Sequence, residues 1–274
     1  MKRFNQLEYL TDCTNLDKNI SNERNTERGF MSFLSDALSI IDTNAQDREK
    51  GLSVVELGIG GGGSHENWSN HLSNDCTVYG VDLFSKDHYL NYKNEIPFAQ
   101  FYYLHNFDHL CKSQDDSTRR LTDDRGTDVA PCKIWHGVDA YSHQAVDLVV
   151  SHNKSLVDFV VDDGDVTSLT ADSLDCWKNA IADTGALFSG TIIGNGNSIA
   201  RALHDDPNWV AEQYQLLANA GYIVFDLAEY KRDIITIEYP MHYMVMYAKD
   251  YNLFKELLIK YQHNIVDGEH NWRK

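Results

Sequence analysis

The chain has 274 residues, 42% of them hydrophobic, and a formal net charge of −17 at pH 7. This length suits one large domain or two small ones, and no stretch approaches the ~20 apolar residues that span a bilayer. The acidic balance argues against non-specific nucleic-acid binding, which depends on clustered Lys and Arg. We therefore expect a small-molecule substrate, with no nucleic-acid or membrane partner.

The five cysteines are scattered, odd in number and without a C-x-x-C pair. This pattern argues against a disulfide framework or a zinc knuckle and indicates reduced thiols in a cytoplasmic setting. Residues 1–6 are followed by polar sequence with no apolar h-region, so we expect no secretory signal.

Three regions follow one another along the chain. Residues 1–49 form an N-terminal helical or irregular segment, with apolar residues at helical spacing over 24–43. Residues 50–250 form the main domain, and residues 251–274 an amphipathic helix packed on it. Within the main domain, apolar runs predict seven strands, at 53–57, 77–81, 133–136, 159–161, 187–193, 222–227 and 242–248. Residues 234–238 and 243–247, close together after 222–227, indicate that the sheet ends in an antiparallel hairpin-like element. Helical patterns lie at 64–72, 141–152, 170–183 and 198–220.

This alternation of strands and helices predicts βαβ units and a parallel sheet. The fold we expect is α/β and doubly wound, with a mostly parallel seven-stranded sheet, helices on both faces and an antiparallel last strand. Residues 84–131 exceed what one βα unit requires, so we interpret them as an insertion that serves as a lid or binding loop. Its paired aspartates are interpreted as solvated charge.

The glycine-rich segment after the first strand is the most informative motif. An apolar run containing Glu56 leads into Gly58 and then into four consecutive glycines at 60–63. Glycine suits a turn where a Cβ would collide with a ligand or where φ must be positive. Asp82 ends the second apolar run, 26 residues after Glu56. The two acids and the turn indicate a nucleoside site.

Two nucleosides fit this pattern. The glycines satisfy G-x-G-x-x-G with an acid further on, as in an NAD-dependent oxidoreductase. Against this interpretation, Glu56 precedes the first glycine by two residues, and the glycines have no Arg or Lys beside them for a pyrophosphate. A later apolar run also delivers Asp162, Asp163 and Asp165 at the carboxyl end of a strand, where open α/β sheets bind ligands.

The motifs, taken in order, resemble those of class I S-adenosylmethionine-dependent methyltransferases over residues 50–248. They are Glu56-x-Gly58-x-Gly60-x-Gly62, Tyr79-Gly-Val-Asp82, Gly137-Val-Asp139-Ala140, Asp158-Phe-Val-Val-Asp162 and Thr184-Gly185-Ala-Leu-Phe188. The resemblance implies a cofactor site formed by Glu56, Gly58, Gly60, Gly62, Ser64, Asp82, Asp139 and Asp162. In it, Asp82 takes the ribose hydroxyls, Asp139 lies near the adenine and Asp162 stands beside the transferred methyl.

Within that family, the segment from Glu56 to Ser64 and the run ending at Asp165 are similar to the macrolide-type sugar O-methyltransferases. Those enzymes use a divalent cation, usually magnesium, and carry Asp-Asp-Gly-Ser-His where this chain has Asp162-Asp-Gly-Asp165-Val. The histidine that serves them as a base is therefore missing. The resemblance implies Asp162, Asp163 and Asn195 as candidate ligands for Mg²⁺, since hard cations prefer oxygen donors.

The function we expect is O-methylation of a small sugar or natural-product-like hydroxyl by S-adenosylmethionine. Asp162, Asp163 or Asp165 would remove the proton, directly or through a cation. An NAD-dependent oxidoreductase and a non-catalytic cofactor-binding protein of the same fold are the alternatives. Among the histidines, we expect His65 to face cofactor or solvent and prefer His242 as a base. The terminal helix is compatible with a homodimer.

Overall fold

The computed structural model describes residues 2–11, 27–59, 63–83, 119–122, 128–164, 171–190, 207–227 and 243–273. Helix α2 (Glu27–Asn44) precedes the sheet, as its apolar spacing predicts. No helix within the described residues is long and apolar enough to cross a membrane. The remaining helices are α3 (Gly63–His71), α6 (His143–Asn153), α7 (Asp175–Ala180), α10 (Pro207–Asn219), α11 (Lys255–Lys260) and α12 (Glu269–Arg273), with 3-10 turns η2 (Ala171–Leu174), η4 (Tyr251–Phe254) and η5 (Gln262–Asn264).

The strands form one mixed sheet in the order β3-β4-β2-β1-β5-β6-β8-β7-β9. They are β1 (Ser53–Leu57), β2 (Thr77–Asp82), β3 (Arg119–Thr122), β4 (Asp128–His136), β5 (Val157–Asp162), β6 (Ile181–Ser189), β7 (Ile223–Asp226), β8 (Tyr243–Ala248) and β9 (Ile265–Asp267). The five strands from β4 to β6 are parallel neighbours. Strand β8 is antiparallel between β6 and β7. The mostly parallel sheet with an antiparallel closing strand is confirmed.

The predicted count of seven strands is wrong, because one extra strand lies at each edge of the sheet. At one edge, β3 pairs antiparallel with β4, so part of the predicted insertion belongs to the sheet, and β4 begins at Asp128. At the other edge, β9 interrupts the predicted terminal helix and pairs with β7. Strands of three or four residues are too short for their periodicity to appear in the sequence. The predicted hairpin-like element includes residues 234–238, which lie outside the described residues.

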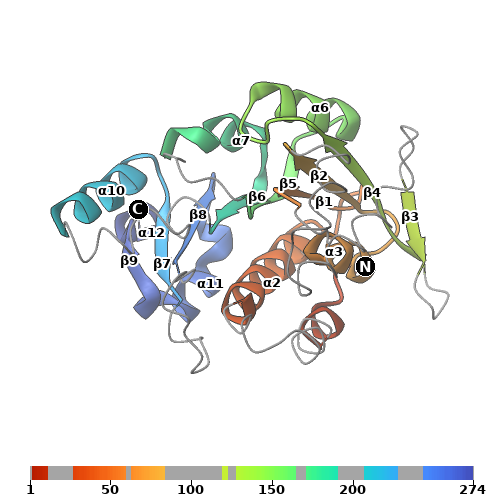
Figure 1. Ribbon diagram of the computed structural model, residues 1–274. Helices are drawn as coiled ribbons and strands as arrows, with labels where there is room; N and C mark the ends of the chain where they lie inside the picture. The colour runs from red at the N-terminus through yellow and green to blue at the C-terminus, as the bar shows by residue number, and fades with distance from the viewer. Residues whose placement is uncertain are drawn as a thin grey trace, which may run out of the picture.

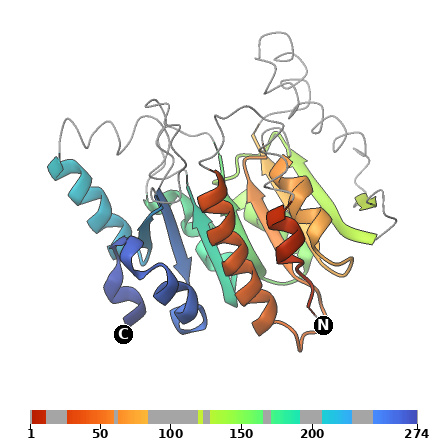
Figure 2. The same cartoon turned by 90° about the horizontal axis from the view of Figure 1, so that it is seen from below.

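Alternating side chains place two apolar cores on opposite faces of the sheet. In β1, Val54 belongs to the core covered by α2 and α3, whereas Val55 and Leu57 belong to the core covered by α6 and α7. Figures 1 and 2 show these helices on the two sides of the sheet. This is the period-two pattern of a strand buried on both faces, and it confirms the doubly wound fold.

The N-terminal segment packs on the first of these cores. Phe4 and Tyr9 are fully buried, and the Tyr9 ring stacks on Trp68 of α3 with centroids 4.4 Å apart. Phe4 also forms an isolated antiparallel bridge with Leu72. Residues 2–11 therefore brace the helix that follows the glycine turn.

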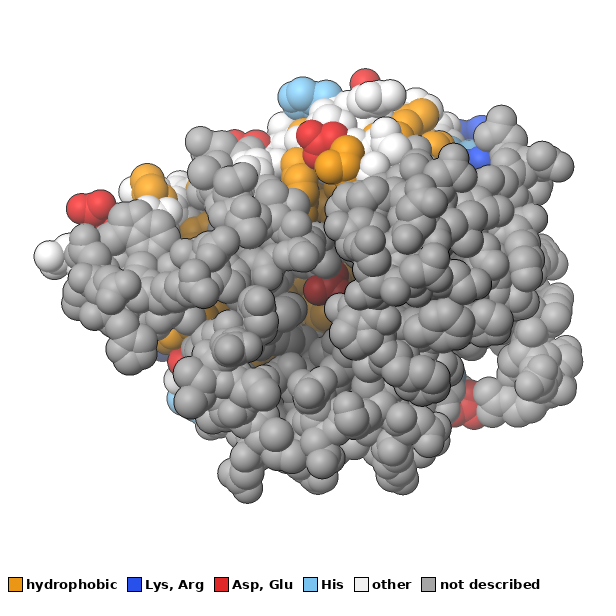
Figure 3. Space-filling model, viewed as in Figure 1, with side chains coloured by type: hydrophobic (Ala, Val, Ile, Leu, Met, Phe, Trp, Pro, Cys, Tyr) orange, Lys and Arg blue, Asp and Glu red, His pale blue; other side chains and the backbone are white. Residues whose placement is uncertain are grey.

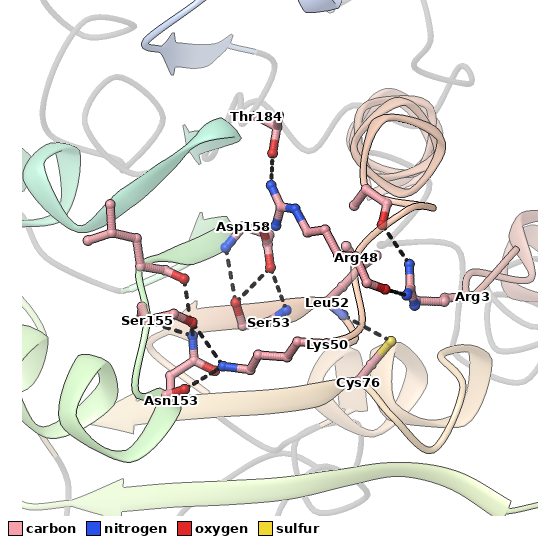
Figure 4. A network of polar contacts seen from close by, with 12 residues as sticks. Arg3, Arg48, Lys50, Leu52, Ser53, Cys76, Asn153, Ser155, Asp158 and Thr184 are labelled. Atoms are coloured by element: carbon pink, nitrogen blue, oxygen red, sulfur yellow. Dashed lines mark hydrogen bonds and ion pairs between the residues drawn. The ribbon is translucent and has the colours of Figure 1, made fainter. Parts of the chain in front are cut away.

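A network of polar contacts lies at the amino-terminal ends of the parallel strands, here called the amino edge, as opposed to the carboxyl edge at their other ends (Figure 4). Asp158, at the start of β5, accepts hydrogen bonds from the amide and hydroxyl of Ser53, both at 2.9 Å. Its other oxygen forms an ion pair with Arg48, which also donates to the Thr184 hydroxyl. Arg3 joins this edge through the carbonyl oxygens of Ala45 and Arg48. These contacts hold β1, β5 and β6 together at the edge opposite the candidate site.

Candidate functional site

The carboxyl ends of four parallel strands meet where the strand order reverses. Leu57, the last residue of β1, is aligned with Val81 of β2 on one side and with Asp162 of β5 on the other. Asp82, which ends β2, is aligned with His136 at the end of β4. Ligands of open α/β sheets bind in the crevice at such a switch point.

Gly58 begins the predicted glycine turn, and its backbone requires glycine for two reasons. Its φ is +77°, in the left-handed region, and a Cβ there would lie 2.4 Å from the Cα of Gly164. The turns that follow β1 and β5 therefore approach each other at backbone distance. Gly60 and Gly62, two other predicted cofactor residues, lie outside the described residues.

Asp82 is buried at the end of β2 and supports the same turn. Its Oδ2 accepts a hydrogen bond from the amide of Ile59 at 2.9 Å, and the amide of Gly58 donates to the carbonyl of Val81 at 2.9 Å. The carboxylate therefore lies against the turn, at the strand end where a ribose ligand is expected.

Glu56 is buried beneath the turn and binds the start of α3. The Ser64 hydroxyl donates to Glu56 Oε1, and His65 Nδ1 lies 2.9 Å from Oε2. The expectation that His65 faces cofactor or solvent is wrong, because its side chain is fully buried against Glu56. The structure thus brings two predicted cofactor residues together, because the hydrogen bond between Glu56 and Ser64 connects the two ends of the glycine turn.

Asp162, predicted beside the transferred methyl, is buried and accepts three hydrogen bonds from uncharged donors. The Tyr141 hydroxyl lies 2.7 Å from Oδ1, the Gly164 amide 3.2 Å from Oδ1, and the Ser189 hydroxyl 2.5 Å from Oδ2. Burial and the neighbouring Asp162 charge raise the pKa of Tyr141 far above its usual value, so the phenol stays protonated and donates. Through these contacts, Asp162 connects the end of β5 with the end of β6 and with the turn between β4 and α6.

Tyr141 and Ser189 were not among the predicted site residues. Tyr141 follows the motif residues Asp139 and Ala140 directly, and Ser189 ends the strand that contains the Thr184 motif. Sequence reasoning did not use the fact that each directly follows a recognised motif. A Cβ on Gly164 would lie 2.1 Å from the Tyr141 hydroxyl. A larger residue at position 164 would therefore block the hydrogen bond between Tyr141 and Asp162.

Two further acids of the edge are exposed. Asp163 is exposed directly after Asp162, and its amide donates to the carbonyl of Leu57 at 2.9 Å. Asp139 is exposed in the turn after β4, where its Oδ1 accepts the amide of Tyr141 at 3.0 Å. Figure 3 shows a hollow on the face viewed, with an acidic side chain at its floor between apolar ones. Asp165 lies outside the described residues, as does His242.

The expected magnesium site finds no support in the described residues. They contain no group of three or more His, Cys, Asp or Glu side chains able to hold a metal ion. The hydroxyls of Tyr141 and Ser189 and the amide of Gly164 already donate hydrogen bonds to the carboxylate of Asp162. Asn195, the third proposed ligand, lies outside the described residues. The described residues thus form no Mg²⁺ site, and no step below passes through a metal.

Uncharged and acidic groups line the turns of this edge. The described turns after β1, β2, β4, β5 and β6 contain no Lys or Arg. A pyrophosphate is commonly held by such cations or by a helix N-terminus. Acidic turns without a cationic side chain suit a ligand with hydroxyls and a positive charge.

No protein-family model and no curated protein sequence matches the chain. Among solved structures, it is similar to a fibrillarin from Aeropyrum pernix with bound S-adenosyl-L-methionine, at 15% identity over 76% of this chain and 73% of that chain, with a TM-score of 0.37. It is also similar to the CurJ carbon methyltransferase, at 14% identity over 86% of this chain and 57% of that chain, with a TM-score of 0.41.

A third match is a cyclopropane-fatty-acyl-phospholipid synthase-like protein from Lactobacillus casei, with 13% identity, 58% of this chain covered and a TM-score of 0.32. The matched part spans half the length of that protein, 50%. Similarity at this level does not establish an activity. The function therefore rests on the geometry of this chain's own residues.

Proposed function

We propose that this chain is an S-adenosylmethionine-dependent methyltransferase acting on an oxygen of a small molecule. The observation that carries the proposal is that Asp82 ends β2 and Asp163 follows β5, on either side of Gly58 after β1, while Asp139 lies in the turn after β4, the strand beyond β2. Carboxylates accept hydrogen bonds from ribose hydroxyls and from an ammonium group, and they favour a sulfonium. The chemistry of these residues fits the cofactor.

Each acid has a distinct task in this proposal. Asp82, at the end of β2, binds the ribose hydroxyls, while the Ile59 amide fixes its other contact. Asp139 lies beside the adenine in the turn after β4. Glu56 and Ser64 hold the glycine turn from below. When bound, the cofactor supplies an electrophilic methyl group, and the protein holds the acceptor oxygen about 3 Å from it, in line with the sulfur.

Asp163 is our candidate for the group that removes the acceptor's proton. It is exposed, whereas Asp162 is buried and bonded to Tyr141, Ser189 and Gly164. A general base has to come within hydrogen-bond reach of the proton that it takes. Asp162 then acts as a positioning residue, which sets the backbone that carries Asp163. Asp165 is the remaining candidate base from the sequence.

The proposed acceptor is a sugar or natural-product-like hydroxyl. One support is the resemblance of the Glu56–Ser64 segment and of the run ending at Asp165 to the macrolide-type sugar O-methyltransferases, described above. The other is the set of acids at the carboxyl ends of the strands, since carboxylates accept the hydrogen bonds of polyhydroxylated molecules. A hydroxyl acceptor also requires a base, and Asp163 provides one at the exposed strand end.

Ligand-dependent thermal stability tests the cofactor. The melting temperature is measured with S-adenosylmethionine, S-adenosylhomocysteine or NAD, each with and without Mg²⁺. A ligand at 100 times its Kd stabilises the protein by about 2.7 kcal/mol, so we expect a clear rise with both sulfur nucleotides and none with NAD. A rise with NAD alone would support the oxidoreductase, and no rise with either sulfur nucleotide would contradict the proposal.

Turnover tests the reaction. Purified protein is incubated with S-adenosylmethionine and panels of sugar, phenolic and carboxylic acceptors, and S-adenosylhomocysteine release is measured. We expect release with hydroxylated sugars or glycosides. Binding of the cofactor without release across all panels would favour the non-catalytic alternative.

A further inference from the structure

A buried acid–base pair lies beneath the glycine turn and connects its two ends. Glu56 is four residues into β1, before the turn, and His65 belongs to the first turn of α3, after it. His65 Nδ1 lies 2.9 Å from Glu56 Oε2, and the side chains are 0% and 1% exposed. The Ser64 hydroxyl occupies the other oxygen of Glu56. Both oxygens of one carboxylate thus fasten the helix to the strand.

The packing around His65 leaves no room for another arrangement. A Cβ at Gly80 of β2 would lie 3.0 Å from His65 Cε1 and 2.4 Å from the Ile59 side chain. A side chain at position 80 would therefore clash with Ile59 and with the imidazole ring that packs beneath the turn. Glu56 holds the ring at Nδ1, and Cys132 of β4 is the other titratable side chain that interacts with it.

The surroundings of His65 favour the protonated form of its ring. Burial alone would lower the pKa of His65, but Cys132 of β4 and Glu56 of β1 raise it to about 10. These two are the titratable groups that act on the ring. A protonated imidazole beside a carboxylate, out of contact with water, forms a charge-assisted hydrogen bond, which is stronger than a neutral one.

We propose that His65 is a positioning residue of the cofactor site, which acts through Glu56 to hold the start of α3 at a fixed distance from the end of β1. The glycine turn between them is thereby preformed for its ligand. This inference rests on the proposed function, because the turn is taken as the cofactor's. His65 itself is buried and does not touch the cofactor.

The pH dependence of this device has a definite sign. The folded-state pKa of His65 is raised above its ordinary value of 6.5. The stabilisation is therefore complete below pH 6.5 and is lost as the pH rises toward about 10. Both the stability of the ligand-free protein and its affinity for the cofactor should fall across this interval.

The test compares His65→Gln with wild type and with His71→Gln. His71 is a buried histidine in the last turn of the same helix, packed edge-on against Tyr9, so it controls for the loss of a buried histidine away from Glu56. Melting temperatures of the ligand-free proteins and calorimetric titrations with S-adenosylhomocysteine are recorded at several pH values between 6.5 and 9.5.

We expect the melting temperature of wild type and His71→Gln to fall with pH, and that of His65→Gln to fall less. At pH 7, His65→Gln should bind S-adenosylhomocysteine about tenfold more weakly than wild type. The inference is overturned if His65→Gln retains both the wild-type slope and the wild-type affinity. If wild type does not bind S-adenosylhomocysteine, the proposed function fails, whereas a reduced slope in His65→Gln still supports the ion pair.

A second measurement covers the case in which His65→Gln does not fold. Nitrogen chemical shifts of His65 in wild-type protein distinguish the imidazolium from either neutral tautomer. Imidazolium shifts that persist at pH 8 support the inference. A neutral ring at pH 7 overturns it.

Discussion

Strand β5 carries a buried aspartate at each end, and the two are held in opposite ways. Asp158, at the amino edge, pairs with the Arg48 guanidinium and with Ser53 (Figure 4). Asp162, at the carboxyl edge, receives hydrogen bonds from Tyr141, Ser189 and the Gly164 amide, none of which is charged. The aspartate at the amino end of β5 is thus in an ion pair, whereas the aspartate at the carboxyl end lies beside further acidic residues.

The difference separates a structural role from a functional one. At the amino edge, the charge of Asp158 is balanced within the fold by a side chain of the same edge. At the carboxyl edge, Asp139 and Asp163 stand exposed beside buried Asp82 and Asp162. In our proposal, the carboxylates of this edge bind a ligand that carries hydroxyls and a positive charge. Four substitutions test whether the two edges differ in this way.

The largest effect should come from Asp163→Asn. If Asp163 takes the acceptor's proton, its loss lowers kcat by about 10² to 10⁴, while the free energy of unfolding changes by less than about 0.5 kcal/mol because the side chain is exposed. Rates of S-adenosylhomocysteine release and urea unfolding measure the two quantities.

Asp162→Asn is the comparison for this variant. It should lower stability, since an amide cannot accept all three hydrogen bonds in the same way. Full activity in Asp163→Asn would remove Asp163 as the base.

Gly58→Ala tests the close approach of backbones at the switch point. The added Cβ meets both a positive φ and the Cα of Gly164 at 2.4 Å, so we expect a loss of about 3 kcal/mol in stability and of cofactor binding. Gly137→Ala is the matched control, because its φ is +70° and nothing lies within 4 Å of its Cβ position. It should cost only about 1–2 kcal/mol. Equal effects of the two substitutions would contradict the account.

Asp158→Ala tests the amino edge. It removes the partner of Arg48 and the acceptor of two Ser53 hydrogen bonds, and we expect the free energy of unfolding to fall by about 2–3 kcal/mol. The folded fraction should bind S-adenosylhomocysteine as wild type does. Asp183→Ala, which breaks an exposed ion pair with Lys249, should cost less than about 1 kcal/mol. Weaker binding of S-adenosylhomocysteine by Asp158→Ala would contradict a purely structural role for the amino edge.

Tyr141→Phe should have the smallest effect. It removes one donor from Asp162 and should lower stability by about 1 kcal/mol and cofactor affinity by a few-fold. Tyr79→Phe removes a comparable hydroxyl, bonded to Asn153, on the same face of the sheet but away from the candidate site. Tyr79→Phe should lower stability by about as much as Tyr141→Phe, about 1 kcal/mol, without changing the affinity for the cofactor. Unchanged affinity in both variants would confine Tyr141 to a structural role.

Sequence reasoning predicted the central sheet well because its strands are long apolar runs bounded by turns. It missed β3 and β9, which are too short to show a period. The positions of Asp82 and Asp162 followed from the motifs, since strand ends of a parallel sheet share one edge. The contacts of Asp162 with Tyr141 and Ser189 did not follow, because they join β5 to β6 and to the turn after β4, which are distant in sequence. The burial of His65 depends likewise on Gly80, a residue of another strand.

The most direct test of the central claim is a calorimetric titration of S-adenosylhomocysteine into wild type and Asp82→Ala. The account predicts one site per chain in wild type and at least a tenfold loss of affinity in Asp82→Ala, because the ribose hydroxyls lose their acceptor. Asp158→Ala should keep the wild-type Kd. An absence of binding to wild type, or equal binding by wild type and Asp82→Ala, would contradict the assignment of the carboxyl edge as the cofactor site.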